Sequence, residues 1–382
     1  MKLYQIPPRI WMEQDAFSRL PKEAKRLSAS KAMIFAGPNI KKAGYVSATE
    51  SGLDAEGISS QVFTDIEPEP SDNTALKAAQ AAREVGADLI IGIGGGSNMD
   101  VAKAVSVLAT NEITLEELRA QPQFAQPGLK KILVPTTAGT GSEVTAFSML
   151  TNHENNKKIS LVDAMLITEV AILDPELTRT APPSVTAYSG MDALVHAIEA
   201  FTSLFATSLT DMFAVQAMKL IMGNIRKAYS DGEDMEARAA MLEGSMLAGI
   251  AFGHAGVTAV HAFSHPLGVT YNIPHGTANT IMLPCIMEFN QEANPARFAM
   301  VAAHLGIEVT GLDERGAALK TVETLRELIA DIDLPADLKS FDARESDIPE
   351  MAGAVIADVP IMFCNPRKME LEDAEAIYRS VL

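Results

Sequence analysis

The 382-residue sequence has few cysteines and few basic residues. Its two cysteines, Cys285 and Cys364, do not form a CxxC pair, which favours two reduced, buried thiols in a cytosolic protein. Lysine and arginine number 31 against 49 aspartates and glutamates, for a formal net charge of −18. Because nucleic-acid binding needs a basic surface for phosphates, this balance argues against a nucleic-acid partner.

The sequence also lacks a signal-peptide pattern and a long unbroken apolar run. Residues 1–8 do not place a charged start before an apolar segment. Residues 246–263 are apolar, but glycines and His254 interrupt them, and the stretch barely reaches the length of a membrane span. We therefore expect a cytoplasmic protein without membrane contact.

The first half of the chain alternates short apolar strands with helices. Turn residues such as Gly37 and Pro38 separate the segments. The predicted strands are 31–36, 61–63, 87–94 and 131–134, and the predicted helices are 42–56, 73–85 and 98–108. An opening strand or hairpin is expected within residues 1–18. Alternation at this interval predicts an α/β fold with a doubly wound parallel sheet.

The pattern changes at a proline-rich step, and no convincing strand follows it. The predicted helices are 184–204, 207–229, 233–252, 258–268, 276–290, 294–305, 313–331 and 370–382. Because the chain is too long for one ordinary core, we expect two domains. The predicted boundaries are 1–181 for an α/β dinucleotide-binding domain and 182–382 for an all-helical domain.

Two loops at the ends of predicted strands are suited to a dinucleotide. Gly95, Gly96 and Ser97 follow a strand and open a helix, where backbone N–H groups and the helix dipole attract phosphate. This run is not a GxGxxG fingerprint, and an ordinary tight turn is the alternative. Residues 135–143 carry several hydroxyls, which are suited to hydrogen bonds with ribose or phosphate oxygens. The alternative is that these hydroxyls form hydrogen bonds with the backbone of their own loop. Together the loops favour a dinucleotide.

Polar side chains also occur inside apolar helical segments after the proline-rich step. Asp192 and His196 are four residues apart, as are His261 and His265, so each pair shares a helix face. His275 follows Pro274 shortly afterwards. These five groups are candidate ligands for a divalent metal, and satisfied core histidines are the alternative. The segment His261–His265 lacks the glutamate of an HExxH zinc-protease motif.

These motifs resemble those of the iron-containing (group III) alcohol dehydrogenases. The resemblance rests on GGGS with Asp100 and Lys103, the TTAGTGSEVT loop at 136–145, DPELT at 174–178 and GMDALVHAIE at 190–199. It continues through the histidine segment ending in His275 and the NPR motif at 365–367. The match spans essentially the whole chain in order. It implies a dehydroquinate-synthase-like architecture, with the metal in a cleft between an α/β domain and an all-helical domain.

The resemblance also implies roles for individual residues. The implied metal ligands are Asp192, His196, His261 and His275, and His265 would be the catalytic histidine. The implied cofactor-binding residues are Gly37, Gly95, Gly96, Ser97, Asp100, Thr136, Thr137, Thr140, Ser142, Lys158 and Leu177.

Three positions depart from the family pattern. Gly37 stands where strictly NAD-dependent members have an acidic residue, so NADP joins NAD as an expected cofactor. Glu69 replaces a common asparagine, and its carboxylate weighs against a phosphate. The segment Phe252–Thr258, which includes His254, differs from the residues that family members usually have at this place. It precedes His261, the first implied ligand after His196.

The ligand set that the resemblance implies suits Fe²⁺ first, with Zn²⁺ as the alternative. The expected reaction is hydride transfer between a nicotinamide and a small alcohol or aldehyde, with His265 relaying the proton. A lyase or a polyol or sugar-phosphate dehydrogenase of the dehydroquinate-synthase-like group is one alternative, and a metallohydrolase is another. The apolar helices favour a homodimer or a larger homo-oligomer.

Overall fold

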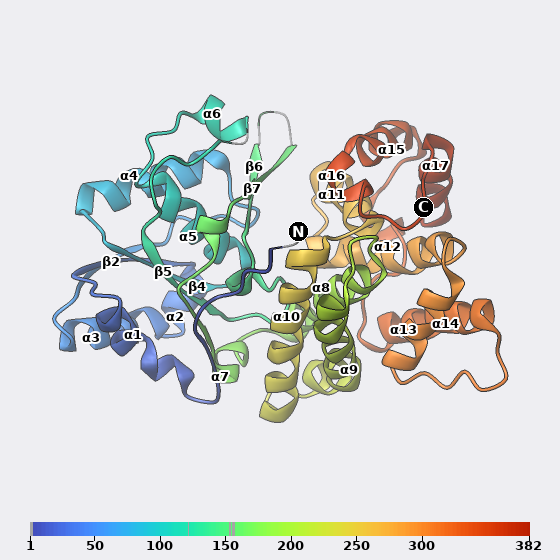
Figure 1. Cartoon of the computed structure of the whole chain (residues 1–382), viewed down its shortest axis with the longest axis horizontal. Coiled ribbons are helices and arrows are strands. Elements are labelled where there is room, and N and C mark those ends of the chain that lie inside the picture. Colours follow the sequence, from blue (N-terminus) through green and yellow to red (C-terminus); the bar gives the residue numbers. More distant parts are fainter. Residues whose placement is uncertain (1–2, 121, 153, 155–156) are drawn as a thin grey trace. The chain divides into compact units, whose positions relative to one another are not determined.

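The computed structural model describes residues 3–120, 122–152, 154 and 157–382. The chain divides into two compact units (Figure 1). The first unit comprises Met1–Thr137 and Gly141–Ala181, and the second comprises Ala138–Thr140 and Pro182–Leu382. The first unit is α/β, whereas the second is helical.

The first unit is built around a parallel sheet of six strands. These are β1 (Ile10–Met12), β2 (Lys31–Ala36), β3 (Ser59–Phe63), β4 (Leu89–Gly94), β5 (Lys130–Pro135) and β8 (Val170–Leu173). Their order is β1-β8-β5-β4-β2-β3, and every pair is parallel. The chain passes from β2 to β3 at one edge and then returns to β4 on the other side of β2. The strand order therefore reverses between β2 and β4.

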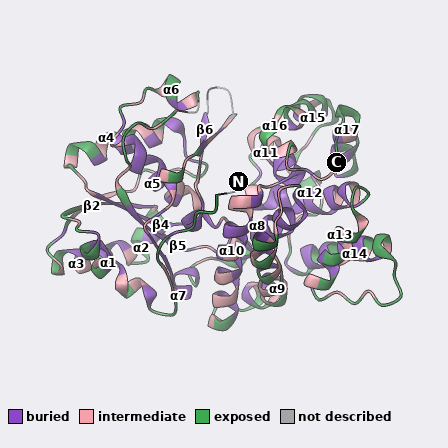
Figure 2. Ribbon diagram, viewed as in Figure 1, coloured by how far each residue is buried: buried purple, intermediate pink, exposed green. Residues whose placement is uncertain are grey.

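Both faces of this sheet are covered by helices, as the apolar strands predict. Met33 and Phe35 of β2 pack in one cluster with α4 (Asp72–Val85) and α5 (Gly96–Leu108). Ala32, Ile34 and Ala36 of the same strand pack in the other cluster, and Figure 2 shows the strands as buried. That second cluster includes residues of α1 (Leu20–Arg26), α2 (Pro38–Lys42) and α3 (Tyr45–Ala55). The helices α6 (Leu115–Arg119) and α7 (Pro175–Thr178) complete the unit.

Several local features of this unit differ from the sequence prediction, and the sheet strand β8 was not predicted. The helix predicted over 42–56 is broken, because Gly44 has a left-handed φ of 88° and α3 starts after it. An antiparallel pair, β6 (Phe147–Asn152) and β7 (Lys157–Val162), is present where no strand was predicted. Its buried residues Leu150, Ile159 and Leu161 pack in the cluster of α4 and α5. Tertiary packing therefore decides the structure of a segment whose own pattern is weak.

The second unit consists of helices, and eight of them match the predicted ones within a few residues, whereas the two between Ile348 and Met362 were not predicted. They are α8 (Pro183–Thr202), α9 (Ser208–Ser230), α10 (Met235–Ala255), α11 (Ala259–Tyr271), α12 (His275–Asn290), α13 (Pro295–His304), α14 (Glu314–Asp331), α15 (Ile348–Ala357), α16 (Val359–Met362) and α17 (Leu371–Ser380). The helix α8 is buried from Ser189 to Thr202 and packs against α9, α10 and α12. The α/β fold class with an all-helical second part is confirmed.

Within the described residues, no single helix has the length and apolar character to cross a membrane. The helices α10 and α11 meet those criteria only as a pair, and the chain bends by 105° between them.

Candidate metal centre and dinucleotide site

Helix α8 supplies the first two polar groups of the candidate metal centre. Asp192 and His196 are one turn apart, and both are buried. Gly190 makes room for the close packing of this helix, because a Cβ there would lie 2.7 Å from Met241 Cε and 3.0 Å from Ile225 Cδ1. The sequence thus places two metal-binding side chains on a helix that tertiary packing encloses.

Helices α11 and α12 bring two histidines to α8. His261 lies in the first turn of α11, and His275 is the first residue of α12. Gly276 allows the start of α12 to approach α8 closely, since a Cβ there would lie 2.2 Å from the carbonyl oxygen of Tyr188. A larger residue at position 276 would force the two helices apart.

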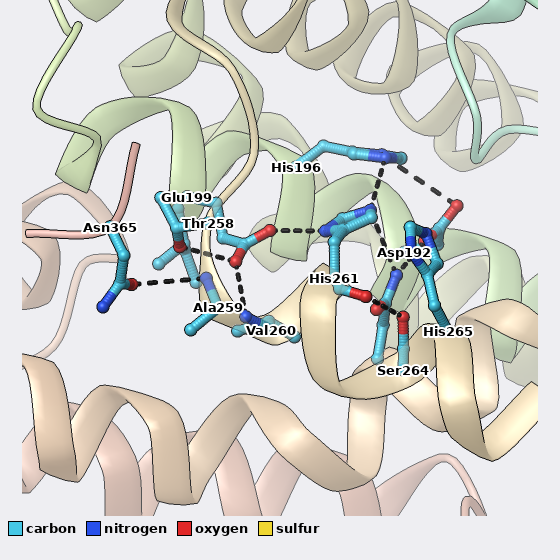
Figure 3. A network of polar contacts seen from close by, with 12 residues as sticks. Asp192, His196, Glu199, Thr258, Ala259, Val260, His261, Ser264, His265 and Asn365 are labelled. Atoms are coloured by element: carbon cyan, nitrogen blue, oxygen red, sulfur yellow. Dashed lines mark hydrogen bonds and ion pairs between the residues drawn. The ribbon is translucent and has the colours of Figure 1, made fainter. Parts of the chain in front are cut away.

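The ligand atoms of Asp192, His261 and His275 all lie within 4.8 Å of one another. His275 Nε2 is 3.7 Å from Asp192 Oδ1. His196 is not part of this closest set, but its Nε2 lies 3.0 Å from His261 Nε2 and its Nδ1 lies 3.9 Å from Asp192 Oδ2 (Figure 3). The structure therefore brings together all four residues that the resemblance identifies as metal ligands.

The ring of His196 is held by stacking. It lies face to face with Phe252, with 4.2 Å between the ring centroids, and stacks on His261 at 4.7 Å. Its Nδ1 is buried without a hydrogen-bond partner in the described structure. The stacked ring thus directs Nε2, and not Nδ1, toward His261 Nε2, where the candidate ligands meet.

Asn279 is a site residue that the sequence analysis missed. It lies on α12, one turn after His275. Its Nδ2 is 2.7 Å from Asp192 Oδ1, 3.2 Å from His275 Nε2 and 3.3 Å from His261 Nε2. An amide has only two hydrogens, so it cannot satisfy all three acceptors. The acceptors converge on one point, as ligands of a cation do. The i, i+4 spacing from His275 was the available signal.

Glu199 is the second missed residue, and it lies one turn beyond His196 on α8. Its Oε1 accepts hydrogen bonds from Thr258 Oγ1 at 2.6 Å and from the Val260 N–H at 2.8 Å. Its Oε2 is in contact with His261 Nδ1. Burial raises the pKa of Glu199 to about 7. The seven-residue spacing from Asp192 puts both carboxyl groups on the same side of α8.

His265 lies beside the close set. Its ring is 5.9 Å from that of His275 and 6.5 Å from that of His261. Its Nδ1 is 3.5 Å from Asp358 Oδ2, and both side chains are partly exposed. This placement next to the candidate metal ligands but outside the closest set suits a proton-transferring group.

The electrostatics of the centre fit a divalent cation. Burial lowers the pKa values of His261 and His275 well below 6.5, so both rings are neutral and offer lone pairs. Burial acts to raise the pKa of Asp192, but interactions that include the hydrogen bond from Asn279 outweigh it and the pKa is lowered. Neither Asp192 nor Glu199 pairs with a lysine or arginine of the described chain. Buried carboxylates without a cation are unfavourable, and a set of imidazole and carboxylate donors without thiolate suits Fe²⁺ or Zn²⁺.

The glycine and hydroxyl loops lie side by side in the α/β unit. The Thr136 N–H donates to the Gly94 carbonyl oxygen at 3.0 Å, and a Cβ on Gly95 would lie 3.4 Å from Thr137 Oγ1. Gly95, the N-cap residue of α5, has no side chain that could cap the helix. The first N–H groups of α5, from Gly96 and Ser97 onward, are therefore available to a phosphate.

Gly37 lies at the end of β2, across the point where the strand order reverses. A Cβ on Gly37 would be 3.6 Å from the side-chain amide of Asn98 in the first turn of α5. Asn98 Oδ1 is buried without a partner in the described residues. Open α/β sheets bind ligands at such a reversal, so Gly37 and the glycine loop flank the expected crevice.

Asp100 and Ser142 bind each other. Ser142 Oγ donates to Asp100 Oδ1 at 2.6 Å, and the Met149 N–H donates to Asp100 Oδ2 at 3.2 Å. The fully buried Lys103 donates to the Ser142 carbonyl oxygen at 2.9 Å and lies 3.3 Å from Asp100 Oδ1. These contacts fasten the hydroxyl loop to α5.

The remaining predicted cofactor residues lie in three settings. Lys158 on β7 pairs with Glu69 and donates to Thr151 Oγ1 at 3.1 Å. Burial lowers the pKa of Lys158 to about 8. Leu177 is buried in the apolar cluster beneath β2 and β4. Thr140 belongs to residues 138–140, which group with the helical unit.

Comparison with known proteins identifies the family. Residues 7–175 match the family described as "Iron-containing alcohol dehydrogenase", and residues 186–382 match "Fe-containing alcohol dehydrogenase family, C-terminal". The chain is 39% identical over 378 residues to long-chain-alcohol dehydrogenase 1 of Geobacillus thermodenitrificans, covering 98% of this chain and 95% of that protein. It is 38% identical over 354 residues to sulfoacetaldehyde reductase of Bilophila wadsworthia, covering 92% of each.

Solved structures agree with this relationship. A 1,3-propanediol oxidoreductase superposes with a TM-score of 0.96 at 36% identity over 100% of both chains. Sulfoacetaldehyde reductase from Bifidobacterium kashiwanohense, in complex with NAD⁺, superposes with a TM-score of 0.91 at 29% identity, covering 100% of this chain and 98% of that one. The predicted family and fold are confirmed. The chain belongs to the iron-containing alcohol dehydrogenase family, and it is an oxidoreductase acting on alcohols and aldehydes.

Proposed function

We propose that Asp192, His196, His261 and His275 hold a divalent metal, with Fe²⁺ as the physiological ion and Zn²⁺ as a substitute. The convergence of the Asp192, His261 and His275 ligand atoms within 4.8 Å, on three different helices, carries this proposal. The surplus of acceptors around Asn279 supports it. When bound, the metal would polarise the C–O group of the substrate for hydride transfer.

The protein side chains then position groups and move the proton. His265 accepts the hydroxyl proton during alcohol oxidation and returns it during aldehyde reduction. Asp358, 3.5 Å from His265 Nδ1, stabilises the protonated ring. Phe252 covers one face of His196 and keeps water from that side of the centre.

The nucleotide would bind where the strand order reverses, with its phosphates at the start of α5. The complex of the Bifidobacterium relative with NAD⁺ supports a nicotinamide cofactor. Gly37 offers no carboxylate to repel a 2′-phosphate, and Glu69 is paired with Lys158. We therefore propose that the enzyme uses NADP as well as NAD.

The reaction is tested by absorbance at 340 nm with NADH or NADPH, a panel of small aldehydes, and added Fe²⁺ or Zn²⁺. Metal-dependent oxidation of the nicotinamide is expected. Hydrolysis of esters or amides without turnover of any carbonyl would instead indicate a metallohydrolase.

The cofactor proposal is tested separately with Gly37→Asp. The new carboxylate should lower kcat/KM for NADPH relative to NADH by about tenfold or more, which corresponds to roughly 1.4 kcal/mol. Unchanged use of NADPH would show that position 37 does not discriminate.

We also infer a cytoplasmic enzyme that forms a homodimer or a larger assembly. The free Cys285 and Cys364 agree with a reducing compartment. Leu204, Met212 and Phe363 of the helical unit are 65%, 70% and 68% exposed, and such apolar groups favour association. Light scattering coupled to gel filtration measures the assembly, and a monomer at micromolar concentration would contradict it.

A further inference from the structure

Glu199 holds the side of His261 that faces away from the other candidate ligands. We infer that Glu199 is a positioning residue that fixes the tautomer of His261 and thereby sets the metal affinity of the centre. The carboxylate is 1% exposed, and Oε2 contacts His261 Nδ1 while His261 Nε2 lies among the ligand atoms (Figure 3). This inference rests on the proposed metal site.

The hydrogen-bonding capacity of the two groups dictates the tautomer. In its ionised form the Glu199 carboxylate only accepts hydrogen bonds, and Oε2 then holds the proton of a neutral His261 on Nδ1. Nε2 then carries a lone pair and lies 3.0 Å from His196 Nε2, where the candidate ligands meet. A carboxylate on the far nitrogen also makes the imidazole a stronger donor to a metal.

The same carboxylate fixes the position of the His261 backbone. Oε1 accepts from the Thr258 hydroxyl and from the Val260 N–H, in the first turn of α11. Thr258, at the N-terminal end of α11, makes no side-chain capping bond within its own helix. Glu199 therefore caps α11 from α8, and one side chain aligns both the ring of His261 and the helix that carries it.

The other histidines of the centre are held differently. Among the described residues His196 Nδ1 has no hydrogen-bond partner, and the ring stacks against Phe252. His265 Nδ1 faces Asp358 at 3.5 Å, in a partly exposed position. His261 therefore differs from these two histidines in having a fully buried carboxylate on its Nδ1. Removing this carboxylate should weaken metal binding.

Glu199→Gln is the diagnostic variant because it keeps the size of the side chain. Its Oε1 can still accept from Thr258 and Val260, but its amide nitrogen donates to His261 Nδ1. The ring proton then moves to Nε2 and blocks the lone pair. We expect the Kd for Co²⁺, measured by competition with a chromophoric chelator, to rise about 10–100-fold. The visible spectrum of the Co²⁺-loaded protein should change, whereas the metal-free protein should stay folded.

Thr258→Val is the matched control, because it removes a hydrogen bond to Oε1 and leaves Oε2 and His261 untouched. Its Co²⁺ affinity should stay within about threefold of the wild type, with an unchanged spectrum. An equal loss of affinity in both variants would mean a merely structural role and overturn the inference. Wild-type affinity and spectrum in Glu199→Gln would do the same.

Glu199→Asp serves if the glutamine variant does not fold. Its shorter carboxylate cannot keep the contacts to α11 and to His261 at once, so weaker Co²⁺ binding and an altered spectrum are expected. Wild-type values would overturn the inference. A wild-type protein that binds no metal would instead refute the proposed metal site, so the two failures are distinguishable.

Discussion

The packing of α12 against α8 at Gly276 sets the geometry of the candidate metal centre, and Gly276→Ala tests it. The added Cβ would lie 2.2 Å from the Tyr188 carbonyl oxygen and 3.3 Å from Asp192 Cβ. Because comfortable contact needs roughly 3.5 Å, the start of α12 must move by roughly 1 Å. His275 is the preceding residue, so it would move away from Asp192. Overpacking of this kind costs about 1–3 kcal/mol.

The stability and activity of this variant should both fall. With about 2–4 °C per kcal/mol for a unit of roughly this size, a cost of about 2 kcal/mol lowers Tm by about 4–8 °C. A displacement of roughly 1 Å at a catalytic centre can lower kcat about 100-fold. Calorimetry, elemental analysis and the 340 nm assay measure these effects. Gly223→Ala is the matched control, since nothing lies within 4 Å of its Cβ, and it should stabilise α9 by about 0.4–1 kcal/mol. If both variants kept full metal, activity and stability, the close approach of α12 would not matter.

Two further predictions concern titratable groups. His265→Ala should retain metal and cofactor but lose about 10²–10⁴-fold in kcat, with an altered pH profile; loss of metal, measured by elemental analysis, would instead make His265 a ligand. Burial raises the pKa of Glu143 from 4.5 to about 7, so the folded state binds more protons than the unfolded state between these values. Stability should therefore fall as pH rises from about 4.5 to 7, by up to about 3 kcal/mol, and Glu143→Gln should relieve this loss at pH 8 but not at pH 4.5. Denaturant unfolding at both pH values measures it, and the same effect of the substitution at the two pH values would refute the assignment.

Apart from α15 and α16, the helices of the second unit could be predicted from the sequence because local signals mark their ends. Asp234, Asn294 and Asp313 each accept a hydrogen bond from a backbone N–H in the first turn of the following helix. The apolar strands β2, β4 and β5 were equally clear, since strands buried on both faces form continuous apolar runs. The hairpin of β6 and β7 was missed because its strands are stabilised by each other and by the core beside α5, which no local pattern shows.

The site was predictable in part for a similar reason. The pairs Asp192 with His196 and His261 with His265 show their helical spacing directly. Glu199 and Asn279 also have helical spacing, but a lone carboxyl or amide group in a helix gives no sign of what it contacts. Only the packing of α8 against α11 and α12 brings these two residues to the histidines. Residues that support ligands through contacts distant in sequence are therefore the part that needs a structure.

The measurement that tests the account most directly is metal-dependent turnover of the stripped enzyme. The protein is freed of metal with a chelator and reloaded with increasing Fe²⁺, and bound metal and the 340 nm rate with an aldehyde are measured on the same samples. The rate should rise in proportion to bound metal and saturate at a single ion per chain. The double variant Asp192→Asn with His275→Ala should lose both metal binding and the 340 nm rate. Full carbonyl reduction by the metal-free protein, or by that double variant, would contradict the account.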